Sequence, residues 1–185
     1  MMKLPMLLAV SALLAVPLAA QAVAYQFTAS LNGTQQVPSN ASSATGFAFL
    51  SYDDMGTAGN TADDLYSFTM GASGWSGTAT NLHIHAPALI GANAGVKVNL
   101  ATFPFVSNTA GLLVVFGSGV ATPYPAFLSD LQSSSAYINI HTAAFGSGEI
   151  RGQLLPVAVV PEPSTYALLL AGIGMIGMLA RRRRG

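Results

Sequence analysis

The sequence contains no cysteine and few charged residues, and both shortages limit what the protein can be. Because its 185 residues include no Cys, disulfide bridges, thiolate metal sites and a cysteine nucleophile are excluded, and the core alone must stabilise the fold. Charged residues make up 8% of the chain and hydrophobic residues 51%. The apolar residues are concentrated at the two termini, which indicates targeting segments around one globular domain.

Basic residues are also scarce in the middle of the chain. Between residues 25 and 160 they are Lys97 and Arg151, against six acidic residues, so two minus six gives a net charge of −4. Nucleic-acid binding needs a basic surface that neutralises phosphates, and this composition excludes it. A middle region of about 130 residues is long enough to bury a core of its own.

The first 24 residues are typical of a secretory signal peptide. Lys3 precedes an almost wholly apolar stretch over 4–20, and Ala22-Val23-Ala24 supplies the small residues that signal peptidase accepts. We predict cleavage after Ala24. The alternative is a permanent N-terminal anchor, but two prolines interrupt the stretch and the small-residue site follows it at once.

The other end of the chain predicts a linker over 156–165 and a membrane helix with an arginine-rich tail over 166–185. Residues 166–180 carry no charge, and Arg181 to Arg184 follow. Fifteen helical residues cover only about 22 Å, short of a hydrocarbon core of about 30 Å, so the flanks must contribute. The arginines favour a cytoplasmic end and place the middle domain on the periplasmic side. The alternative is a C-terminal core helix with a solvated basic tip.

This tail resembles the PEP-CTERM sorting signal. The sequence Val-Pro-Glu-Pro-Ser, with Pro161, Glu162 and Pro163 at its centre, is followed by a short apolar stretch and an arginine cluster. The resemblance implies export by a Gram-negative, exopolysaccharide-making bacterium and processing near Pro-Glu-Pro by an exosortase. The membrane anchor would then be temporary, and the mature protein would reach the cell surface or the medium.

From residue 25 the pattern changes to short apolar runs separated by clusters of Gly, Pro, Asn, Asp and Ser. This pattern predicts an all-β domain over 25–155, a single antiparallel β-sandwich or barrel of about eight strands. The predicted strands are 25–31, 45–52, 65–70, 81–85, 96–100, 112–116, 136–141 and 149–154. One short helix is expected over 125–131, where a proline suits the first turn.

Six motifs in this region together resemble the CHRD domain, which is named from chordin, an extracellular antagonist of growth factors. They are FTASLNG at 27–33, VP at 37–38, ATG at 44–46, LHIH at 82–85, YINIHT at 137–142 and GEIRGQL at 148–154. The resemblance implies an extracellular module, because such domains are widespread in secreted bacterial proteins, where their activity is largely undefined. Residues 36–39 depart from the family, which usually has an acidic residue and a second proline there.

All three histidines lie in two of these motifs. His83 and His85 are two residues apart on one strand and therefore project to the same side, while His141 shares a face of another strand with Tyr137 and Asn139. The Gly-Ser-Gly sequence at 146–148 indicates a hairpin, so we expect the predicted strands 136–141 and 149–154 to be neighbours in the sheet. The predicted polar patch comprises His83, His85, Tyr137, Asn139, His141, Glu149 and Arg151.

Three interpretations of this patch stay open. A His-x-His strand with a third histidine can supply three nitrogen ligands to zinc or copper, which makes His83, His85 and His141 a candidate metal site. Alternatively, the imidazoles bond to the backbone and to Glu149 or Arg151 and fix the strand ends. The patch could instead contact carbohydrate or protein.

The other candidate sites are weaker. The acidic loop with Asp53, Asp54, Asp63 and Asp64 invites a calcium site, but its spacing matches no known calcium loop, and a solvated turn is the better interpretation. The sequence contains no Gly-x-Ser-x-Gly elbow, phosphate-binding glycine loop or hydrolase carboxylate pair, so we predict no enzyme.

The sequence therefore supports three hypotheses for function. The first is a non-enzymatic extracellular binding or matrix module that contacts exopolysaccharide or an extracellular protein and needs no cofactor. The second is a periplasmic or extracellular metalloprotein that holds zinc or copper at the three histidines. The third is an envelope structural protein without a specific ligand.

Overall fold

The computed structural model describes residues 23–57, 59–74, 77–109, 111–121, 124–158 and 163–183. Residues 1–22 of the predicted signal peptide, and Pro161 and Glu162 of the predicted sorting motif, lie outside these ranges. Ala24, after which we predict cleavage, is the first residue of the first strand.

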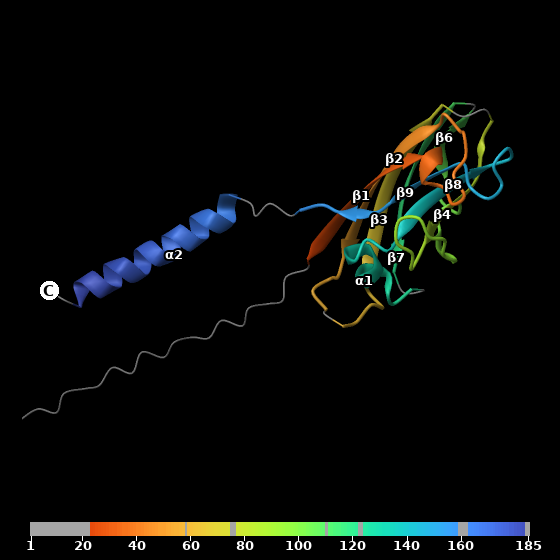
Figure 1. Ribbon diagram of the computed structural model, residues 1–185. Coiled ribbons are helices and arrows are strands. Elements are labelled where there is room, and N and C mark those ends of the chain that lie inside the picture. Colours follow the sequence, from red (N-terminus) through yellow and green to blue (C-terminus); the bar gives the residue numbers. More distant parts are fainter. Residues whose placement is uncertain are drawn as a thin grey trace, which may run out of the picture.

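The described strands form one antiparallel sheet that curls into a half-barrel (Figure 1). They are β1 (Ala24–Asn32), β2 (Thr45–Asp53), β3 (Leu65–Ser73), β4 (Ala79–His85), β5 (Val96–Asn99), β6 (Phe105–Thr109), β7 (Leu112–Val120), β8 (Tyr137–Thr142), β9 (Ile150–Gln153) and β10 (Leu155–Pro156). Their order is β5-β4-β8-β9-β1-β2-β3-β7-β6, and β10 pairs with β1. The predicted all-β antiparallel fold is confirmed, and β6 and β10 are strands that the sequence analysis did not predict.

Strict alternation of side chains explains where the core lies. In β2, Ala48, Leu50 and Tyr52 are buried, whereas the alternating Phe47 and Phe49 are exposed. Successive side chains of a strand point to opposite faces, so one face of the curled sheet encloses the core and the other meets solvent. β8 is different, because five of its six residues are buried and both of its faces are covered.

A short helix, α1 (Phe127–Gln132), is the only α-helix described between the strands and overlaps the predicted helix 125–131. Its Phe127 is fully buried and packs edge-on against Tyr52 and Tyr66, with ring centroids 5.8 Å apart in both pairs. A 3₁₀ turn, η1 (Gly33–Gln35), follows β1. Helix α1 therefore adds an aromatic contact to the core.

A side chain connects two strands that do not pair. The backbone N–H of Ala79 in β4 donates to Oδ1 of Asn108 in β6 at 2.8 Å, and Nδ2 of Asn108 donates to the Ala79 carbonyl at 2.9 Å. The amide of Asn108 thus satisfies both backbone groups of Ala79 as a neighbouring strand would. The Asn108 side chain therefore connects β4 and β6, which lie toward opposite ends of the strand order.

At the C-terminal end, α2 (Pro163–Arg182) covers most of the predicted membrane segment. Its large apolar side chains, including Leu168, Ile173 and Met178, are exposed. In the part of the chain that the structure describes, none of the helices combines the length and the apolar character that crossing a membrane requires. The membrane span therefore stays a prediction.

Candidate metal centre

The three histidines come together because β4 and β8 are direct neighbours in the sheet. In the register of this pair His83 lies opposite Asn139, His85 opposite Tyr137, and Asn81 opposite His141. Directly paired residues point to the same face of a sheet. The two strands therefore place all three imidazoles on the face that is turned away from Leu82 and Ile84 in the core.

The imidazoles are close enough to share one ion. Nδ1 of His83 lies 3.2 Å from Nε2 of His141, and one nitrogen of each ring lies within 4.8 Å of the other two. Two nitrogens that bind one tetrahedral zinc at ~2.0–2.1 Å are about 3.3 Å apart. The His83–His141 pair already has this separation.

Backbone carbonyls determine which nitrogen of two rings carries the proton. Nδ1 of His85 lies 2.9 Å from the carbonyl oxygen of Ala94, and Nδ1 of His141 lies 2.9 Å from that of Gly146. Because a carbonyl oxygen only accepts, each Nδ1 must be the N–H donor, and each Nε2 carries the lone pair. Metal-binding histidines are commonly oriented in this way by a carbonyl on the other ring nitrogen.

The Nε2 atom of His85 has no hydrogen-bond partner within the described ranges, although it is buried. The side chain is only 8% exposed. Leaving a buried polar atom unpaired costs about 1–3 kcal/mol, so a native structure needs a reason for it. A metal ion between the three rings would use this lone pair.

The surroundings of His83 and His85 favour the neutral imidazole, which is the form that binds a metal. Burial, reinforced by His141 and His85, lowers the pKa of His83 to about 4. Burial also lowers the pKa of His85, where the Ala94 carbonyl acts in the opposite direction. Since metal and proton compete for the same lone pairs, rings that resist protonation are suited to a metal site.

Tyr137 and Arg151 form a layer behind His85. The rings of His85 and Tyr137 are stacked, with centroids 4.8 Å apart and planes 1° from parallel. The Arg151 guanidinium covers the ring of Tyr137 at 3.8 Å. Arg151 is 2% exposed and donates to Oδ1 of Asn93 at 3.0 Å and to the carbonyl of Ala92 at 2.8 Å.

These contacts fasten the loop over residues 86–95 on top of the polar face. Gln153 contributes a further bond by donating to the carbonyl of Ala88 at 2.9 Å. The loop carries Ala94, which holds His85, so Arg151 acts on the histidine through this loop. Neither Ala94 nor Gly146 was predicted as part of the site, because a backbone carbonyl leaves no signal in the side-chain sequence.

The two remaining predicted patch residues, Asn139 and Glu149, form their side-chain hydrogen bonds with groups other than the histidines. Asn139 lies on the same face, and its Oδ1 accepts from Nε2 of Gln36 at 2.8 Å. Glu149 is buried, and its carboxylate accepts from the hydroxyls of Ser42 and Thr142 rather than from an imidazole. Glu149 therefore ties a loop to β8 and adds no charge to the histidine cluster.

The acidic loop does not gather into a second centre. Asp54 accepts from the backbone N–H groups of Val23 and Gly56, Asp63 accepts from Thr57, and the buried Asp64 accepts from the Tyr52 hydroxyl. Over the described ranges, the three histidines are the one group of at least three His, Asp or Glu residues close enough to hold an ion. The acidic side chains stabilise turns instead.

Comparisons with known proteins agree with both resemblances in the sequence. The model of the CHRD domain matches residues 27–154, and the model of the PEP-CTERM protein-sorting motif matches residues 159–184. The first match contains every strand from β2 to β9 and all three histidines. No curated protein and no solved structure shows significant similarity to the chain.

Proposed function

Because the chain belongs to the CHRD domain family and carries a PEP-CTERM sorting motif, we propose that it is an extracellular module that binds a zinc or copper ion through His83, His85 and His141. The sorting motif identifies an exported protein that is anchored in the membrane before an exosortase-type enzyme processes it. The metal is the part of the proposal that rests on geometry.

The observation that carries the proposal is the buried, unpaired Nε2 of His85. Its ring is held by the Ala94 carbonyl, is stacked on Tyr137, and has its remaining lone pair free. The large majority of buried polar side-chain atoms have a hydrogen-bond partner. The alternative, in which the imidazoles only fix strand ends, accounts for the bonds to Ala94 and Gly146 but not for this atom.

The ligand set favours borderline transition metals. Three neutral imidazoles without a carboxylate suit zinc and copper better than calcium or magnesium, which prefer oxygen ligands. His83 and His141 are only partly buried, so a metal held by them faces solvent on one side. A water molecule or a donor group from a partner would complete a tetrahedral coordination there.

Metal analysis of the full-length chain tests the proposal. After equilibration with zinc or copper and removal of free metal, we expect about one ion per chain. A variant with His83→Ala and His85→Ala should lose the ion, whereas Asn81→Ala, an exposed position on the same strand, should retain it. Metal-free wild-type protein, or equal loading of the two variants, would rule the site out.

The export and processing of the protein are the second part of the proposal. Signal peptidase would cut after Ala24. The helix over 166–185 would hold the precursor in the inner membrane, with the domain on the periplasmic side. Processing near Pro161-Glu162-Pro163 would then deliver the domain to the cell surface or the medium. The sorting motif supports this route, and the basic tail supports the orientation. A binding or matrix role without metal is the second candidate, and the outer face of the sheet favours it.

A further inference from the structure

Three phenylalanines lie exposed on the outer face of β2 and β7, on other strands than the histidines. Phe47, Phe49 and Phe116 are 58%, 37% and 57% exposed. Phe49 and Phe116 lie in one row across the sheet with Thr69 between them, and Phe47 lies in the next row opposite Gly71. We call these three residues the aromatic platform.

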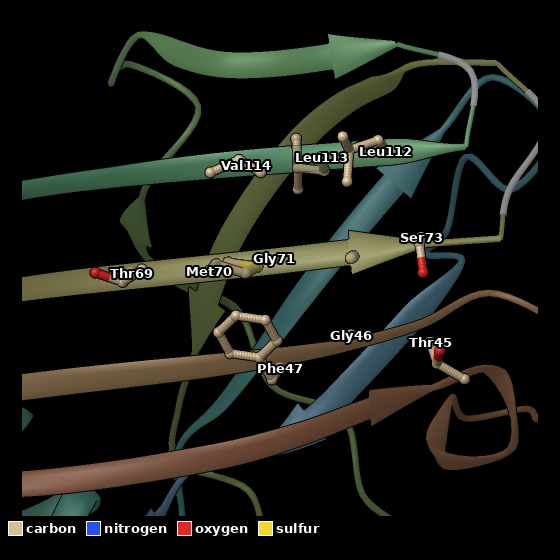
Figure 2. A pocket seen from close by; sticks show the side chains of 11 residues that line it. Thr45, Gly46, Phe47, Thr69, Met70, Gly71, Ser73, Leu112, Leu113 and Val114 are labelled. Carbon is tan, nitrogen blue, oxygen red and sulfur yellow. The ribbon is translucent and has the colours of Figure 1, made fainter.

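The ring of Phe47 lies down on the sheet instead of standing away from it. Figure 2 shows the ring extending from β2 toward Gly71 of β3. A Cβ atom on Gly71 would come within 2.7 Å of Cε1 and 3.0 Å of Cζ of this ring. The missing side chain at position 71 therefore makes the space that the ring occupies, and the ring presents one of its faces to solvent.

Hydroxyl groups lie beside this ring, and charges are nearly absent. Thr45, Thr69 and Ser73 are exposed and line the same shallow depression, which Leu112 and Val114 of β7 complete. β2, β3 and β7 are described over their whole length, and Asp53 at the end of β2 is the only charged residue in them. The surface thus offers an apolar plane and neutral hydrogen-bonding groups, and attracts neither anions nor cations.

We propose that the aromatic platform binds a neutral polysaccharide. A pyranose ring has an apolar face of C–H groups, which packs on the exposed face of Phe47, and equatorial hydroxyls, which reach Thr45, Thr69 and Ser73. The chain of sugars continues along the sheet to Phe49 and Phe116. This site is separate from the histidines, and it gives the binding or matrix role a chemical class of ligand.

A second copy of the chain is the competing occupant of this surface. Sheets that pack face to face interdigitate the side chains of both partners. Val114 lies opposite Gly71 and the 47% exposed Leu112 lies opposite Ser73, so the depression has an aliphatic side on β7 as well as hydroxyls (Figure 2). The sugar is favoured at the ring itself, because Phe47 lies flat over Gly71 and has no projecting part that a second sheet would interdigitate.

Affinity electrophoresis of the full-length chain tests the proposal, with gels that contain hydroxyethylcellulose, dextran or the anionic polysaccharide alginate. We expect retardation by at least one of the two neutral polymers, and affinity about tenfold weaker in Phe47→Ala. Val106→Ala, which removes a 62% exposed apolar side chain from β6, should bind as the wild type does. No retardation in either neutral gel, retardation by alginate alone, or an unchanged Phe47→Ala would overturn the proposal.

The variant Gly71→Ala tests whether the orientation of the Phe47 ring matters, because it keeps the ring but changes how it lies on the sheet. The backbone of Gly71 is not in the left-handed region, so alanine fits the strand, but its Cβ must lift the ring of Phe47. We expect unchanged thermal stability together with polysaccharide binding weakened several-fold. Wild-type binding by this variant, or a chain mass of two copies in light scattering that becomes one copy in Phe47→Ala, would contradict a sugar-binding platform.

Discussion

Nδ1 of His83 and Nε2 of His141 lie 3.2 Å apart across the directly paired strands β4 and β8. Because Nδ1 of His141 already donates to Gly146, the proton between the two rings must belong to His83. The two nitrogens stand at the separation that a tetrahedral ion imposes on its ligands. A metal held between them would take the place of the proton on Nδ1 of His83, and that proton would move to Nε2 of the same ring.

The carbonyl contacts predict the tautomers of two histidines. In the metal-free protein, nitrogen NMR of the imidazoles should show neutral His85 and His141 protonated at Nδ1, because Ala94 and Gly146 accept from that atom. Zinc should then change the Nε2 resonances of both rings. Protonation at Nε2 in either ring would refute the arrangement of lone pairs on which the metal site depends.

Replacing Arg151 by lysine should destabilise the domain, although the positive charge is kept. The guanidinium covers Tyr137 and reaches both Asn93 and the Ala92 carbonyl, which a compact ammonium group cannot do from one position. We expect the free energy of unfolding in urea to fall by about 2 kcal/mol. Lys97→Arg, an exposed change of the same kind, should have little effect, and equal stability of both variants would show that the stacked layer is dispensable.

Gly152 in β9 should not tolerate a side chain. A Cβ atom there would lie 2.4 Å from the carbonyl oxygen of Ser30 in β1, so the two strands would have to separate. Gly152→Ala should lower the free energy of unfolding by about 1–3 kcal/mol. Gly146→Ala, where a Cβ meets open space, is the matched control and should unfold like the wild type. Similar stability of the Gly152 and Gly146 variants would disprove the close approach.

Alkaline pH should weaken the fold through the tyrosines near α1. Burial, followed by the hydrogen bond to Asp130, raises the pKa of Tyr124 from 10.0 to about 12, and burial also raises the pKa of Tyr52 and Tyr66. Between pH 10 and 12 the unfolded chain releases protons that the folded chain keeps, so the free energy of unfolding should fall as pH rises. Denaturation at several pH values should show this decline, with a smaller slope in Tyr124→Phe. A flat profile in the wild type would contradict it.

Much of the fold could be predicted because alternation and turn residues are local signals. The predicted strand 25–31 is one residue shorter than β1 at each end, and the predicted strand 45–52 is one residue shorter than β2 at its C-terminal end. β6 was missed because its five residues, FVSNT, are mostly polar and only partly buried. β10 was missed because it has two residues, one of them a proline, and depends on its pairing with β1.

The candidate site could be predicted only in part. Because side chains alternate along a strand, the sequence places His83 and His85 on one face of their strand. The same alternation places Tyr137, Asn139 and His141 on one face of another strand. The pairing of β4 with β8 then brings the two sets together. The burial of Arg151 could not be predicted, because it results from a loop that folds back from residues 86–95 onto the last strand. Glu149 bonds to Thr142 on β8 because a turn precedes β9, and no periodicity describes a turn.

The most direct test of the metal site is anomalous X-ray diffraction at the zinc edge from crystals of the zinc-equilibrated chain. The account predicts one anomalous peak ~2.0–2.1 Å from Nδ1 of His83, Nε2 of His85 and Nε2 of His141. Crystals with no peak between these three atoms, or with zinc held only elsewhere on the chain, would contradict it.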